Sequence, residues 1–231
     1  MTLPPTRPVV CLVTHGARLA TGVDGAAAVA DALVAQAGEA ARAGVDLVQV
    51  RELDLDAGPL TTLVERIVDA VRGTRTRVLV NDRLDVAMAA GAHGVHLRAD
   101  SYSASRVRSI APADFLVGRS VHTAEEVADV AAEGAMDFLV FGTVFTSRSK
   151  PAGHPSAGIE ALARAVDAAA GVPVLAIGGI TLGAMPVVAA AGAAGVAAID
   201  MFLPGGARPG PTLAEAVASL RRAFDSVGEV H

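Results

Sequence analysis

Residues 115–150 decide our expectation of the fold, and they read FLVGRSVHTAEEVADVAAEGAMDFLVFGTVFTSRSK. The pattern predicts a strand, a turn, a helix, a second strand and a polar loop, in that order, over residues 115–117, 118–122, 124–133, 138–141 and 142–150. In parallel α/β proteins the loops after the carboxyl ends of strands converge on one face, where active sites form. We therefore expect His122, which can move protons, and Lys150, which can hold an anion, to share that face.

The transition from helix to strand in this stretch recurs along the chain. An Ala-rich segment is followed by a small residue and a glycine, and then by an apolar strand, at Gly44, Gly91, Gly134 and Gly192. Glycine suits the left-handed position that ends a helix. Further segments have the composition of strands without this pattern. The eight expected strands cover residues 9–13, 47–50, 77–80, 95–97, 115–117, 138–141, 173–177 and 196–199.

Helical segments follow the expected strands. They cover residues 26–43, 59–72, 84–90, 104–110, 124–133, 159–169, 183–191 and 212–224. Strands that alternate with helices indicate βαβ units and a parallel sheet, and eight such units close most naturally into a barrel. We predict one α/β domain over residues 1–231, a single (β/α)8 TIM barrel, with residues 1–7 as a flexible tail.

The composition is consistent with this fold and argues against some partners. A chain of 231 residues that is 52% hydrophobic can form one large barrel with a full core. The net charge of -5 gives no reason to expect nucleic acid or an anionic membrane as a partner. The single Cys11 lies in an apolar run and is expected to be a core residue.

The amino-terminal residues lack the basic-then-apolar pattern of a signal peptide. No apolar run approaches the roughly 18–20 residues that span a bilayer. We therefore expect a cytoplasmic protein without a membrane partner.

Polar residues follow the second and third expected strands. Arg51 offers a planar donor fork for a carboxylate or phosphate, or alternatively forms an ion pair with Glu52 or Asp82. Asp82 is either a magnesium ligand or a cap for the helix that begins near Leu84. The residue types leave both choices open.

Two histidines have different expected roles. His96 lies within a strand, so an interior, hydrogen-bonded histidine is expected there. His122 comes just before a helix at the barrel mouth, where it is either a general acid/base or a solvated loop residue. The histidines never fall at the close spacing of metal ligands, which argues against zinc.

Gly178 and Gly179 follow the seventh expected strand and predict a phosphate cradle. Glycines leave backbone amides uncovered, and the loops after strands seven and eight are the usual phosphate site of such barrels. A Gly-Gly pair also forms ordinary tight turns, so its position carries the prediction.

Together these segments resemble the thiamine-phosphate synthase and TenI (thiazole tautomerase) superfamily over nearly the whole chain. The segments are QVRE at 49–52, NDR at 81–83, GVHL at 94–97, GRSVHT at 118–123, FGTVF at 141–145 with Lys150 beyond it, and AIGGI at 176–180. Their common order is specific for the superfamily but does not settle the branch.

Resemblance to the synthase branch implies that a pyrimidine diphosphate is held by five residues and that magnesium binds Asp82. The five residues are Gln49, Arg51, Asn81, Ser120 and Lys150. Diphosphate then leaves, and the thiazole nitrogen captures a pyrimidine methyl cation. The chain departs from that branch because a family lysine is Leu53 here and the second magnesium aspartate aligns with Ser101. These losses would weaken activation of the diphosphate.

Resemblance to the TenI branch implies that His122 shuttles a proton to aromatise a thiazole carboxylate phosphate, without a metal or other cofactor. Arg51 and the Gly178–Gly179 pair would hold the anion. The Arg-Ser-Val-His and Phe-Gly-Thr-Val-Phe segments favour this branch.

One departure affects both branches. Where the family usually has a small pair after the eighth strand, this chain has Asp200 and Met201. A carboxylate beside a phosphate is repulsive, so either Asp200 points away or the ligand is altered.

We therefore predict a TenI-type thiazole tautomerase, an isomerase, with thiazole phosphate or thiamine phosphate as its small-molecule partner. The alternative is a thiamine-phosphate synthase, a transferase that uses magnesium. A second alternative is a non-catalytic regulator that binds thiamine or thiazole phosphate. The sequence leaves a homo-oligomer open.

Overall fold

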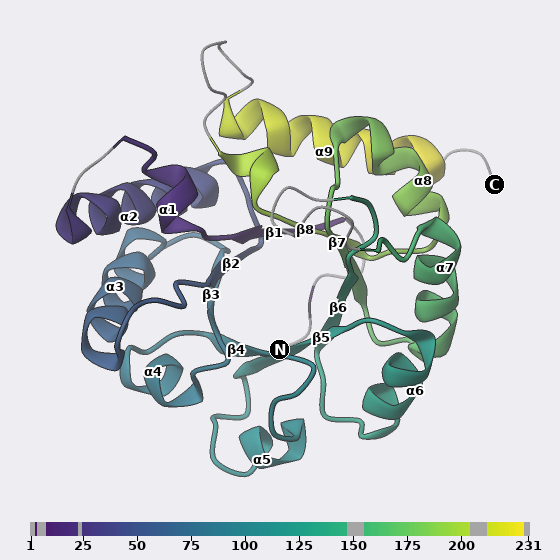
Figure 1. Ribbon diagram of the computed structural model, residues 1–231, viewed down its shortest axis with the longest axis horizontal. Coiled ribbons are helices and arrows are strands. Elements are labelled where there is room, and N and C mark those ends of the chain that lie inside the picture. Colours follow the sequence, from purple (N-terminus) through teal and green to yellow (C-terminus); the bar gives the residue numbers. More distant parts are fainter. Residues whose placement is uncertain (1–2, 4–7, 23–24, 147–154, 204–211, 229–231) are drawn as a thin grey trace.

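The computed structural model describes residues 3, 8–22, 25–146, 155–203 and 212–228. Eight parallel strands close into a barrel in chain order, from β1 beside β2 round to β8 beside β1 (Figure 1). The strands are β1 Val9–Val13, β2 Leu47–Val50, β3 Arg77–Asn81, β4 Gly94–Leu97, β5 Leu116–Val121, β6 Phe138–Gly142, β7 Val174–Ile177 and β8 Gly195–Ala198. The predicted single TIM barrel is confirmed.

Helices form an outer ring around this barrel (Figure 1). They are α1 Gly16–Leu19, α2 Ala26–Arg42, α3 Ala57–Ala70, α4 Leu84–Ala89, α5 Ala104–Arg108, α6 Ala124–Ala132, α7 Ile159–Ala168, α8 Met185–Ala190 and α9 Leu213–Gly228, with the 3-10 turns η1 Leu182–Ala184 and η2 Asp200–Phe202. Most lie where the sequence predicted a helix, with ends shifted by a few residues.

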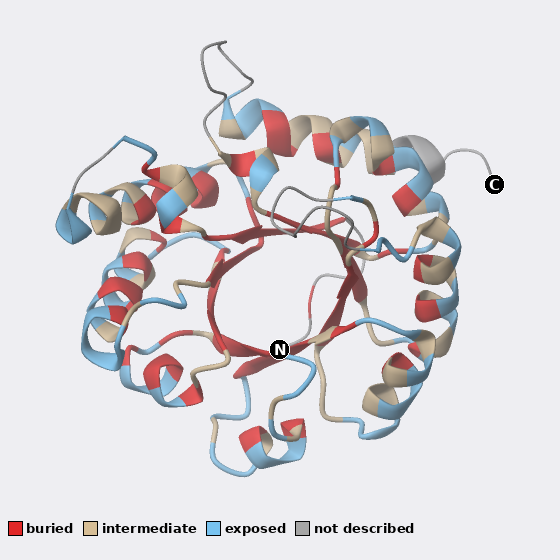
Figure 2. Ribbon diagram, in the orientation of Figure 1, coloured by how far each residue is buried: buried red, intermediate tan, exposed pale blue. Residues whose placement is uncertain are grey.

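The strands carry the core on both faces, and Figure 2 shows them as a continuous buried ring. One apolar cluster lies between the sheet and the helices. A smaller inner cluster fills the barrel and includes Cys11, as predicted for a core residue, and also Leu3. Burial raises the pKa of the Cys11 thiol to about 12, so it is an inert packing group. The rest of the predicted tail lies outside the described residues. Among the described helices, none is both long enough and apolar enough to span a bilayer.

The recurring glycines end helices as predicted. Gly44, Gly91, Gly134 and Gly192 have φ values of 84°, 64°, 65° and 81°, in the left-handed region that lacks a penalty only for glycine. Each turns the chain from a helix into the next strand, which places the carboxyl ends of the strands on one face.

One local prediction was wrong and one helix was missed. Strand β5 runs to Val121 rather than ending at residue 117, so residues 118–121 continue the strand and do not form a turn. Polar Arg119 and Ser120 hid this because a buried strand was expected to be apolar. The short helix α1 was not predicted, since four residues carry no helical periodicity.

Candidate active site

Four polar side chains form a layer at the carboxyl ends of neighbouring strands β2 to β5: Gln49, Asn81, His96 and Ser120. Three of them lie two or four residues beyond a leucine of the inner cluster, so the alternation of side chains along a strand turns them into the barrel. Gln49 Nε2 donates to Asn81 Oδ1 at 3.1 Å, and His96 Nε2 lies 2.9 Å from Ser120 Oγ. We call these four side chains the polar layer.

His96 is the most buried member of the polar layer. Its ring stacks on Phe138 with 5.9 Å between ring centroids. Burial, with a smaller contribution from the Arg119 charge, lowers the pKa of His96 to about 3. The ring is therefore neutral at physiological pH. The predicted interior, hydrogen-bonded histidine is confirmed, and Nδ1 has no partner among the described residues.

Arg51 follows β2, and its guanidinium forms no ion pair with a carboxylate of the described residues. Its backbone N–H donates to Thr14 Oγ1 at 3.0 Å, while Glu52 accepts from Thr14 Oγ1 at 2.5 Å and from the Gly16 amide at 2.9 Å. Within the described residues no carboxylate lies within 4.0 Å of the Arg51 guanidinium. The ion-pair alternative is therefore wrong for Glu52 and Asp82, and the guanidinium can hold an anion.

Asp82 follows β3 in a left-handed conformation, with φ of 58°. Its Oδ1 accepts a hydrogen bond from Ser101 Oγ, and its Oδ2 lies 4.0 Å from Arg98 Nη1. Asp82 does not cap α4, because Arg83 occupies the N-cap and makes no side-chain cap bond. The capping alternative is wrong, and the left-handed conformation of Asp82 is uncommon for a non-glycine residue.

His122 lies at the mouth of the barrel after β5 and is exposed. Its backbone N–H donates to Glu126 Oε2 at 2.7 Å, and its Nδ1 lies 2.5 Å from the carbonyl oxygen of Gly142. A carbonyl oxygen only accepts, so Nδ1 carries the proton and Nε2 of a neutral ring holds the lone pair. The ring is thus oriented by β6 and can take up a proton at Nε2.

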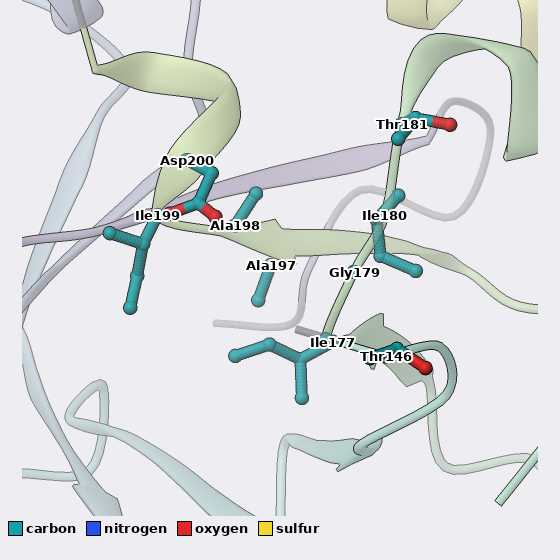
Figure 3. A pocket seen from close by; sticks show the side chains of 10 residues that line it. Thr146, Ile177, Gly179, Ile180, Thr181, Ala197, Ala198, Ile199 and Asp200 are labelled. Carbon is teal, nitrogen blue, oxygen red and sulfur yellow. The ribbon is translucent and has the colours of Figure 1, made fainter. Parts of the chain in front are cut away.

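A cavity of about 310 Å³ opens at the ends of β7 and β8, and we call it the glycine cavity (Figure 3). Gly178 and Gly179 have φ of 99° and 63°. Among the described residues, the amides of Gly179 and Ile180 donate to no acceptor. The lining residues are Thr146, Ile177, Gly178, Gly179, Ile180, Thr181, Ala197, Ala198, Ile199 and Asp200.

Asp200 lines the glycine cavity, and its Oδ1 forms an ion pair with Arg18 Nη1 from α1. Sequence reasoning missed Arg18, because it lies on the unpredicted helix α1, which Glu52 holds through the Gly16 amide. Lys150 lies outside the described residues. No hydrogen bond or ion pair joins His122 to the polar layer within the described part of the chain.

Comparison with known proteins identifies the family. The family model described as thiamine monophosphate synthase (TMP-TENI) matches residues 20–202. The chain belongs to the thiamine monophosphate synthase family.

Individual proteins that are similar to this chain are also named as thiamine-phosphate synthases. The chain is 43% identical to the thiamine-phosphate synthase of Anaeromyxobacter dehalogenans, over 84% of this chain and 83% of that protein. It is 40% identical to the thiamine-phosphate synthase of Methanoculleus marisnigri, over 70% of this chain and 75% of that protein. A solved thiamine phosphate pyrophosphorylase from Pyrococcus furiosus superimposes with a TM-score of 0.74 at 25% identity, covering 96% and 98% of the two chains. These names favour the synthase alternative over the tautomerase.

Resemblance to the synthase branch implies magnesium, and the side chains near Asp82 fit one binding mode. Magnesium is usually held by one or two carboxylates together with waters and substrate phosphates. Asp82 and Ser101 offer a carboxylate and a hydroxyl in contact with each other, whereas Asp100 pairs with Arg98 at 2.7 Å. Within the described ranges no group of three or more acidic, histidine or cysteine side chains could enclose a metal ion. The residues fit an ion that arrives with a diphosphate.

Proposed function

We propose that this chain is a transferase of thiamine biosynthesis that joins a pyrimidine methyl diphosphate to a thiazole and releases diphosphate. The observation that carries the proposal is the separation of two charges at adjacent strand ends. Arg51 has no carboxylate partner among the described residues, and Asp82 is held in a strained conformation beside Ser101. A diphosphate that carries a bound metal cation needs a positively charged group for the diphosphate and a negatively charged group for the cation.

Arg51 would hold the diphosphate by its donor fork. Gln49, Asn81 and Ser120 would hold the pyrimidine, since amides and hydroxyls match the donors and acceptors of such a ring. Asp82 and Ser101 would hold magnesium, which offsets the charge that develops on departing diphosphate. A neutral His96 beneath the pyrimidine adds no positive charge to oppose a developing methyl cation.

The chain lacks the family lysine, which is Leu53 here, and a nearby arginine partly offsets this loss of positive charge. The guanidinium of Arg98 lies 4.0 Å from Asp82, so a cation lies near the expected diphosphate site despite Leu53. Leu53 itself is 63% exposed. This arrangement supports the transferase.

The test is release of diphosphate from the pyrimidine substrate, with the thiazole supplied as its phosphate and, separately, as the free alcohol. Wild-type protein with magnesium should release diphosphate, and Asp82→Asn or a chelator should reduce the rate by about a thousandfold. Asp85→Asn is the matched control, because Asp85 forms an exposed ion pair with Arg83 at 2.6 Å. Equal rates in wild type and Asp82→Asn would contradict the proposal.

The orientation of His122 favours a second candidate, the thiazole tautomerase. With Nδ1 held by the Gly142 carbonyl, Nε2 is the basic atom that a proton shuttle requires. In a coupled assay with an authentic synthase, this candidate predicts faster product formation that needs the partner enzyme and vanishes in His122→Ala. Ligand binding that survives His122→Ala without either activity would instead indicate a regulator.

A further inference from the structure

Asp200 presents a carboxylate to the glycine cavity. The loops after the seventh and eighth strands are the usual phosphate site of such barrels, and the sequence left two explanations for an acidic residue there. Figure 3 shows Asp200 beside Ile199 and Ala198 at the end of β8, and all three residues line the cavity. Asp200 is therefore part of the cavity wall, which favours an altered ligand over the first explanation, that Asp200 points away.

The backbone around Asp200 is anchored. Phe202 is 5% exposed, and its carbonyl accepts a hydrogen bond from buried Gln36 Nε2 at 2.9 Å. The Phe202 amide donates to the Ile199 carbonyl at 3.1 Å. Turn η2 is thus tied to α2 and to the end of β8, which keeps Asp200 at the cavity wall.

The cation that pairs with Asp200 belongs to a residue outside the cavity lining. Arg18 pairs with Oδ1, is absent from the cavity lining, and has a solvent-inaccessible Nη1. Oδ2 accepts no hydrogen bond from any residue in the described ranges, and the Asp200 side chain is 43% exposed. The cavity lining therefore contains the carboxylate but not the guanidinium that pairs with it.

The glycines of the cavity have a packing reason that is independent of phosphate. A Cβ on Gly179 would lie 2.3 Å from the Thr146 carbonyl oxygen, and one on Gly178 would lie 2.5 Å from Thr143 Cγ2. The close approach of residues 143–146 thus requires both glycines. What they leave for a ligand is the pair of uncovered amides on Gly179 and Ile180.

A cavity whose wall includes a carboxylate acceptor and residues with uncovered amide donors matches a hydroxyl, which both donates and accepts hydrogen bonds. A phosphate monoester, which is mostly dianionic at neutral pH, offers acceptor oxygens that suit the amides but meet the carboxylate as a like charge. Asp200 supplies the only ionisable side chain among the described lining residues.

We propose that Asp200 determines specificity in this cavity and makes it prefer a thiazole alcohol to the corresponding phosphate monoester. This inference rests on the proposed function, which brings a thiazole to the cavity. In the coupling step, the carbon–oxygen bond to diphosphate breaks and its electron pair leaves with diphosphate. The lone pair of the thiazole nitrogen forms the new carbon–nitrogen bond, and the hydroxyl takes no part.

The test is calorimetric titration of the full chain with the thiazole alcohol and with its phosphate monoester. Wild-type protein should bind the alcohol about tenfold more tightly, the effect of about 1.4 kcal/mol of charge repulsion. Asp200→Ser and the isosteric Asp200→Asn should both reverse the preference, because each removes the charge. Asp31→Ser, which breaks an exposed ion pair with Arg66 on the outer helices, should keep the wild-type ratio.

Several results would overturn the inference: tighter binding of the phosphate by wild type, an unchanged ratio in both Asp200 variants, or no binding of either thiazole. A reversal in Asp200→Ser alone would make cavity space the cause rather than charge, and would also overturn it. Its failure is distinguishable from failure of the transferase. Diphosphate release that is faster with the thiazole phosphate overturns only the inference, whereas the expected binding ratio without diphosphate release overturns only the transferase.

Discussion

The two sides of the barrel mouth are built differently. On the β2–β5 side, the polar layer consists of side chains that are mostly buried and hydrogen-bonded to one another. On the β7–β8 side, the glycine cavity consists of backbone, small side chains and the half-exposed Asp200. We infer that changes to the buried groups of the first side affect folding as well as ligand binding, whereas changes to Asp200 on the second side affect mainly which ligand binds.

The largest expected effect comes from filling the space beneath the polar layer. A Cβ on Gly118 would lie 2.2 Å from Cζ of Phe138, a buried ring that stacks on His96. The ring cannot move without disturbing His96, so Gly118→Ala should lower the free energy of unfolding by about 3 kcal/mol. Denaturant unfolding followed by circular dichroism measures this.

Gly183→Ala is the matched control on the β7–β8 side. A Cβ there meets only Thr181 Oγ1 at 4.0 Å, and the backbone is not left-handed. This variant should be neutral or stabilised by about 0.5 kcal/mol. Equal destabilisation of both glycine variants would break the proposed difference between the two sides.

The fold was predictable because its signals are local and repeated. Helix-ending glycines such as Gly44 and Gly134 and short apolar runs located the strands, and alternation with helices implied the barrel. The end of β5 was not predictable by this rule. Arg119 faces the β4–α5 loop and donates to the carbonyls of Ala99 and Ser101, so a polar strand end is satisfied only by contacts that lie far away in sequence.

The next largest expected effect is a pH dependence of stability that comes from the buried His96 of the polar layer. Its pKa is about 3 in the folded protein, against an ordinary value of 6.5 for a solvated histidine, so the unfolded chain takes up a proton that the folded chain excludes. The stability that this provides is complete above pH 6.5 and is lost as the pH falls toward 3. We expect the protein to be about 2 kcal/mol less stable at about pH 5 than at about pH 8 from this group.

His96→Gln should flatten most of this pH dependence, whatever its effect on stability at neutral pH. His93 will keep a small slope of the same sign, because burial lowers its pKa as well. Unfolding free energies measured across the pH range in both proteins separate the two histidines. A slope that is unchanged in His96→Gln would show that the polar layer does not exclude the proton.

The site was predictable on one side of the mouth more than on the other. Gln49, Asn81 and Ser120 were named through the resemblance to the synthase branch, and in the structure the alternation of side chains along β2, β3 and β5 turns them into the barrel. The direction of Asp200 depends on η2, on the Gln36 hydrogen bond and on Arg18 from α1, and none of these leaves a periodic signal. The sequence showed that Asp200 departs from the small residues usual in the family, but it could not show where the carboxylate lies in the fold.

The smallest expected effect tests whether the charge pair at the glycine cavity contributes to folding. Arg18 and Asp200 are 27% and 43% exposed, so solvent screens their attraction. Arg18→Gln should therefore change the free energy of unfolding by no more than about 0.5 kcal/mol. The same substitution leaves the Asp200 carboxylate without its cation, so the phosphate monoester should bind more weakly still while the alcohol is little affected. A stability loss as large as that of Gly118→Ala would mean that the pair is structural, and the cavity side would then resemble the polar layer. A loss confined to phosphate binding would mean that this part of the mouth serves ligand selection. The Asp200 carboxylate would then contribute little to folding, and its role would be to disfavour the phosphate monoester.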